Sequence, residues 1–155
     1  MSFFGNTWWI GLIAGVVMAA VAMLLRAAGF SKLDMLGYEG AFFTGKRTGV
    51  ATIILGSLMH GVVSVVVAYI YIFALRLLGL PVSWYYGLLL GILHWIIAGL
   101  VIPLMDDANP GVRGGFVLPV GVFAYKYGLA TMASFALAHL AYGLTLGLLY
   151  SKFGG

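Results

Sequence analysis

Three histidines are the side chains of this sequence best suited to chemistry, and each lies in a different, strongly apolar stretch. A neutral imidazole binds copper, zinc or haem iron, forms hydrogen bonds between packed helices, and takes part in proton transfer inside membranes. His60, His94 and His139 therefore have three alternative roles: fixing helix packing, binding a cofactor, or lining a path for a proton or solute.

A cofactor site would use His60, His94 and His139, with Met18 as a weaker fourth ligand. His60 and His139 would bind a haem from its two faces, or the three histidines with Met18 would form a copper or zinc site. Each ligand lies in a separate stretch, so no spacing motif supports such a site, and hydrogen bonding between helices is the first interpretation. The chain has no cysteine, which excludes thiolate ligands and disulfides.

A path for a proton or solute ranks last, because the acidic residues lie outside the apolar stretches. A cation-coupled carrier usually keeps a carboxylate near the middle of the membrane, whereas all four acidic residues here occupy links or the end of a stretch. They are Asp34, Glu39, Asp106 and Asp107. We interpret the last two as a solvated turn rather than as a metal or headgroup site.

The apolar stretches that carry the histidines predict membrane-spanning helices. Hydrophobic residues make up 63% of the chain and charged residues only 8%, whereas about a quarter of a typical soluble domain is charged. Four stretches, 8–25, 49–75, 84–105 and 128–150, each approach the roughly 20 residues that cross a bilayer. The expected fold is an all-α membrane protein, a four-transmembrane-helix bundle that forms one domain over residues 1–155.

The three histidines are expected at a similar depth. At about 1.5 Å per residue, His60 and His139 lie roughly 16 Å from one end of their helices and His94 roughly 15 Å from the other, near the middle of a layer about 30 Å thick. Small residues one turn away, such as Gly56 and Gly91, mark faces where helices approach closely. We therefore expect the imidazoles to point into the bundle.

A weak internal repeat divides the four helices into two hairpins. Residues 49–60 match residues 128–139 at a separation of 79, including a Gly-x-Ala-Thr start and the final histidine, and residues 8–15 match residues 84–91 at a separation of 76. Two spans per unit give both units the same orientation, related by an axis along the membrane normal. The expected hairpins are 8–75 and 84–150.

The links between the helices predict the topology. Residues 26–48 and 106–127 hold six of the eight basic residues, so the positive-inside rule places both links in the cytoplasm and both termini outside. The protein is then integral to a membrane, which we expect to be a bacterial inner membrane. The apolar residues 116–124 are too short to span and are expected to lie in the interface or re-enter. Expected headgroup contacts come from basic residues in the links, Lys46, Arg47 and Lys126.

Several short patterns resemble a group of uncharacterised bacterial four-helix membrane proteins with one histidine in each of the last three spans. The patterns are Leu58 with His60, then Gly91, His94 and Trp95 in a span that ends at Pro103, and finally Ala138 to Gly147. The resemblance implies the four-helix fold. It implies no activity, because that group has none established.

The sequence contains no motif of a known catalytic site, so a non-enzymatic role is expected. The leading hypothesis is an accessory or assembly subunit of a larger membrane complex, because glycine-rich helix faces favour association. The expected partners are the lipid bilayer and other membrane subunits or a second copy, with no nucleic acid. The alternatives are a haem- or copper/zinc-binding protein and, last, a small transporter or channel.

Overall fold

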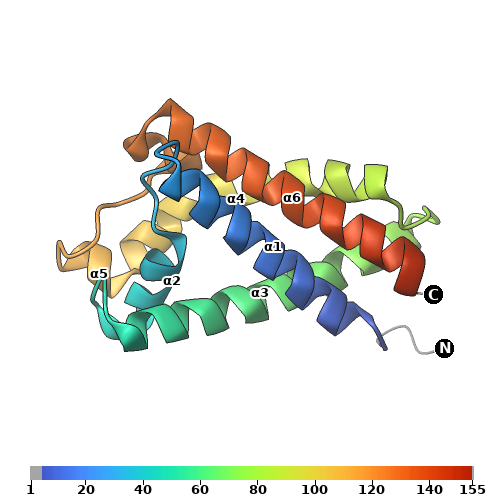
Figure 1. Ribbon diagram of the computed structural model, residues 1–155, viewed down its shortest axis with the longest axis horizontal. Coiled ribbons are helices and arrows are strands. Elements are labelled where there is room, and N and C mark those ends of the chain that lie inside the picture. The colour runs from blue at the N-terminus through green and yellow to red at the C-terminus, as the bar shows by residue number, and fades with distance from the viewer. Residues whose placement is uncertain (1–4, 155) are drawn as a thin grey trace.

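The computed structural model describes residues 5–154, and this part of the chain is built from helices without strands. Four helices are long and apolar enough to cross a membrane. They are α1 (Thr7–Ala27), α3 (Val50–Leu77), α4 (Trp84–Ala108) and α6 (Leu129–Phe153) (Figure 1). The prediction of an all-α, four-helix membrane bundle is confirmed, with helix ends within three residues of those expected.

Three short helices lie in the long links. The link before α3 contains α2 (Met35–Thr44), and the link before α6 contains α5 (Pro110–Arg113) and the 3-10 helix η1 (Val122–Tyr127). Asp34 caps the start of α2, and its Oδ1 accepts a hydrogen bond from the Gly37 amide at 3.1 Å. Gly45 caps the end of the helix with a φ of 64°, which suits glycine. The sequence analysis did not predict α2.

Within each expected hairpin, the two long helices pack directly through small residues. Gly11 and Gly15 of α1 lie against Ser64 and Ala68 of α3, with no room for a Cβ atom at either glycine. The equivalent faces of α4 and α6 meet at Gly87, Gly91, Gly143 and Gly147. The contacting positions of the two hairpins correspond at the separations that define the repeat: 76 residues between α1 and α4, and 79 residues between α3 and α6. The repeat itself stays a prediction, which the matched contacts favour.

The two halves join mainly through α1, which packs on α6 as well as on α3. Both long links come together at one end of the bundle, while the termini and the turn before α4 lie at the other end (Figure 1). At the link end, α2 lies along the first turns of α3 and contacts α5. Which side of the membrane this end faces stays a prediction.

The interpretation of Asp106 and Asp107 as a solvated turn is wrong for Asp106. Its carboxylate is only 6% exposed and accepts hydrogen bonds from the Tyr38 hydroxyl at 2.9 Å and from the amides of Val120 and Gly121 at 3.0 and 2.7 Å. The link between α4 and α6 folds back over the end of α4, which removes the carboxylate from water. Only Asp107 remains exposed.

The apolar segment 116–124 returns to the bundle, one of the two arrangements expected for it. Val117, Val120 and Ala124 are buried, and the ring of Phe123 packs on Gly99 and lies 4.9 Å from the Trp95 ring, centroid to centroid. Gly99 leaves the space that the Phe123 ring fills, so the second link reaches as deep as the middle of α4.

Candidate functional site

A buried pair of side chains, Glu39 of α2 and His60 of α3, forms where the first link meets the bundle. Two glycines make this meeting close, since a Cβ atom at Gly40 would collide with the backbone of Thr52, and one at Gly56 with the carbonyl of Leu36. Because α2 lies directly on α3 at these points, Glu39, which directly precedes Gly40, lies beside His60. The first link therefore places a carboxylate beside a histidine expected near mid-membrane.

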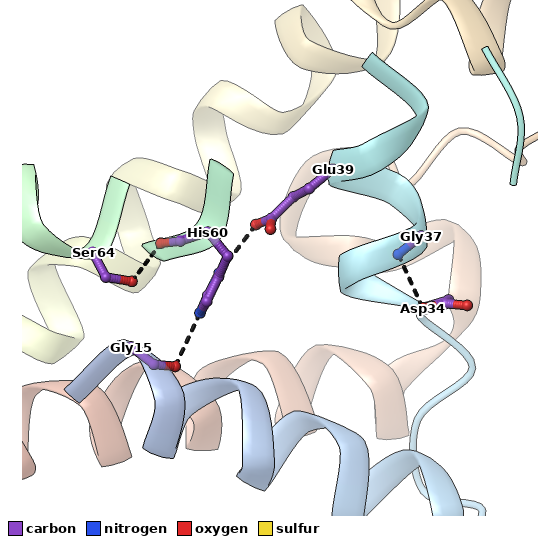
Figure 2. Close-up of polar contacts among 6 residues, drawn as sticks. All are labelled: Gly15, Asp34, Gly37, Glu39, His60 and Ser64. Atoms are coloured by element: carbon purple, nitrogen blue, oxygen red, sulfur yellow. Dashed lines mark hydrogen bonds and ion pairs between the residues drawn. The ribbon is translucent and has the colours of Figure 1, made fainter. Parts of the chain in front are cut away.

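The His60 ring bridges three helices. Its Nδ1 lies 3.3 Å from Oε1 of Glu39 on α2, and its Nε2 lies 3.0 Å from the carbonyl oxygen of Gly15 on α1. Figure 2 shows the ring spanning the gap between these two partners, while Ser64 donates a hydrogen bond to the His60 carbonyl at 2.7 Å. The side chains of His60 and Glu39 are only 10% and 16% exposed, so water contributes little to their hydrogen bonding.

The chemistry of these partners fixes how many protons the pair holds. A carbonyl oxygen only accepts, so Nε2 of His60 carries a proton for Gly15. The contact between Nδ1 and Glu39 then needs one further proton, either on the imidazole or on the carboxyl group. The pair is uncharged overall in both arrangements, which suits an apolar site. Glu39 and His60 thus share one proton that has two alternative positions.

The second oxygen of Glu39 is poorly satisfied. Oε2 is buried, and no residue of the described chain, 5–154, donates a hydrogen bond to it. Burial raises the pKa of the Glu39 carboxyl above its ordinary value, while the hydrogen bond and charge of His60 act in the opposite direction. A buried carboxyl group with a raised pKa and an unsatisfied oxygen is a candidate for a functional site.

The other two histidines lie together in the half of the bundle formed by α4 and α6. The rings of His94 and His139 are 4.7 Å apart, centroid to centroid, in an edge-to-face arrangement. His139 is 2% exposed, and its Nδ1 donates to the Phe135 carbonyl at 2.7 Å. That bond needs a single proton on the ring. His139 therefore makes its contact without sharing a second proton with another side chain, unlike His60 in its pair.

The sequence-predicted cofactor ligands do not form one cluster. No group of three or more histidine, aspartate or glutamate side chains within residues 5–154 is arranged to hold a metal ion, and both ring nitrogens of His60 face Glu39 and Gly15. Met18 is 5% exposed and packs in the apolar core. Binding of haem, copper or zinc by His60, His94, His139 and Met18 stays a prediction without support from this geometry.

The predicted headgroup contacts lie at the link end of the bundle. Lys46, Arg47 and Lys126 are exposed there. Their position suits anionic headgroups at the membrane surface, and the contact itself stays a prediction.

Glu39 is the functional candidate that the sequence analysis missed. The sequence analysis placed Glu39 in the 26–48 link and predicted no helix there that packs against a span, whereas α2 lies on α3. The available signal was the helix start at Asp34 followed by Gly37 and Gly40, three residues apart, because small residues at helical spacing mark a face on which another helix can pack.

No protein-family model, curated protein or solved structure matches this chain. The resemblance to bacterial four-helix membrane proteins therefore gains no support from these comparisons, and the fold stands on the four spanning helices alone.

Proposed function

We propose that this chain is a small membrane protein that conducts protons, with Glu39 and His60 as the group that takes up the proton and passes it on. The observation that carries the proposal is the set of contacts around this pair: two acceptors face the two nitrogens of His60, and the second carboxyl oxygen of Glu39 has no described partner. Buried acid and histidine side chains inside a membrane are costly and are typical of proton relays. Among the alternatives drawn from the sequence, this corresponds to a small transporter or channel.

Exchangeable groups continue from His60 towards the far end of the bundle. One turn along α3, the carbonyl of Ser64 accepts a hydrogen bond from the Tyr142 hydroxyl at 2.5 Å. The Tyr142 ring lies 5.8 Å from the His94 ring, and His94 lies 5.9 Å from Tyr71, centroid to centroid. These hydroxyl and imidazole groups line the interior beyond the pair and provide further positions for a moving proton.

Proton flux in liposomes tests the proposal. The full chain is reconstituted in liposomes that contain a pH-sensitive dye, and a potassium gradient with valinomycin sets the membrane potential. We expect acidification faster than in empty liposomes, and at least tenfold slower flux for Glu39→Gln, because an amide cannot release a proton. Asp107→Asn is the matched control, since Asp107 is an exposed carboxylate at the same end of the bundle.

Two outcomes would overturn the proposal. One is flux through the wild-type chain no faster than through empty liposomes. The other is equal flux in Glu39→Gln and wild type, with both proteins equally folded by thermal melting.

The accessory-subunit hypothesis loses its main argument in this structure. It relied on glycine-rich faces being free for partner helices, whereas Gly11, Gly15, Gly87 and Gly143 pack between helices of the same chain. The remaining apolar surface of the four spans suits lipid. The subunit role stays a hypothesis, and copurification of a stoichiometric membrane partner would support it.

A further inference from the structure

A cavity of about 170 Å³ opens between α1, α2 and the start of α3 at the link end of the bundle. Its walls carry small and apolar side chains, including Ala19, Ala22 and Leu36, with an ion pair among them. Arg26 and Asp34 form this pair at 3.1 Å, with side chains 42% and 20% exposed. A space of this size with charged groups in its wall has room and partners for several water molecules.

The cavity lies next to the Glu39–His60 pair. Leu36 precedes Glu39 by three residues on α2, and Ala19 follows Gly15 by four residues on α1. Residues three and four apart on a helix share one face and are separated by about one turn, roughly 5 Å. Both walls of the cavity thus end one turn from the contacts of His60.

We propose that this cavity is a water-filled entrance through which protons from the link end of the bundle reach Glu39. The inference rests on the proposed function for its purpose, since an entrance needs a proton acceptor at its end. The acceptor is the buried Oε2 of Glu39, which has no partner among the described residues. A proton carried by water in the cavity has one helical turn left to cross before it reaches the carboxyl group.

Accessibility of single thiols to water tests the entrance without using proton flux. The natural chain has no cysteine, so each variant carries one thiol. Ala19→Cys and Ala22→Cys place it in the cavity wall, and Ala20→Cys places it at the same depth on α1 but outside the cavity lining. The probe is a membrane-impermeant, trimethylammonium-bearing methanethiosulfonate, applied to the full chain in open lipid nanodiscs.

We expect Ala19→Cys and Ala22→Cys to react at least tenfold faster than Ala20→Cys. Leu36→Cys, on the opposite wall, should react as fast as Ala22→Cys and replaces any α1 variant that fails to fold. Equal rates at cavity positions and at residue 20 would overturn the entrance. Labelling does not depend on proton flux, so this result is separate from the flux test. Equal proton flux in Glu39→Gln and the wild type would overturn the proposed function, whereas equal labelling rates would overturn only the entrance.

Discussion

Each long link of this protein contributes to a buried carboxylate, and the two carboxylates are satisfied very differently. Asp106, at the second link, accepts three hydrogen bonds of 2.7 to 3.0 Å from the chain around it. Glu39, in the first link, has one contact at 3.3 Å to His60 and a second oxygen without a described partner. A fully hydrogen-bonded carboxylate is held in one position, whereas a partly satisfied one keeps an oxygen that can accept a further hydrogen bond or a proton.

The histidines repeat this difference. His60 faces two acceptors and needs a shared proton, whereas His139, its counterpart at a separation of 79 residues, donates to a carbonyl of its own helix. In the second half, the residue that the link packs onto the middle of α4 is Phe123, whose ring lies against Trp95 and Gly99. Burial alone therefore does not identify the proton site; the balance of donors and acceptors around each group does.

The largest expected effect in this comparison is structural. Asp106→Ala leaves the Tyr38 hydroxyl and two backbone amides without their acceptor, and should lower the free energy of unfolding by about 3–5 kcal/mol. Thermal melting in detergent, followed by tryptophan fluorescence, measures the change. Asp107→Ala should melt like the wild type, since Asp107 is exposed. Equal melting temperatures for Asp106→Ala and Asp107→Ala would show that the hydrogen bonds of Asp106 do not stabilise the fold.

An intermediate effect should appear in how stability depends on pH. The pKa of Glu39 is raised in the folded state, so the stability it contributes is complete below its ordinary pKa and is lost as the pH rises through the raised value. Loss of one proton corresponds to about 1.4 kcal/mol per pH unit in that range. The melting temperature of the wild type should thus fall as the pH rises, whereas the melting temperature of Glu39→Gln should not show this fall. An unchanged slope in the variant would contradict the assignment.

The smallest effect is expected at His139. His139→Gln replaces a neutral imidazole with a neutral amide, and should change proton flux in liposomes by less than about twofold, because its hydrogen bond needs no shared proton. His60→Gln should reduce the flux at least tenfold in the same measurement. A large loss of flux at His139 would show that the two halves do not differ as their hydrogen bonds indicate.

The four spanning helices could be predicted from the sequence because bilayer thickness and backbone hydrogen bonding leave few alternatives for long apolar stretches. The glycine contacts between α1 and α3 also follow from spacing that is visible in the sequence. The depth of the histidines was estimated from the same helix geometry. These features depend only on local composition and on the period of a helix.

The site could not be predicted because it depends on where the first link packs. Glu39 is 21 residues from His60 in the chain, and only the close contacts of Gly40 with Thr52 and of Gly56 with Leu36 bring them together. The burial of Asp106 could not be predicted for the same reason, because its donors Val120 and Gly121 reach it only through the packing of the second link. Charged residues in a link are solvated by default, and tertiary packing decides the exceptions.

The bond between Tyr38 and Asp106 has a consequence for biosynthesis. Tyr38 precedes Asp106 by 68 residues in the chain, so its hydroxyl waits for that acceptor during synthesis. The carbonyl of Tyr38 likewise waits for Asn109, whose side chain donates to it at 3.0 Å. The α2 helix thus acquires its last polar partners only after α4 has emerged. We expect the nascent first hairpin to expose α2 to proteases until that moment, so that the closing of the link end marks completion of the bundle.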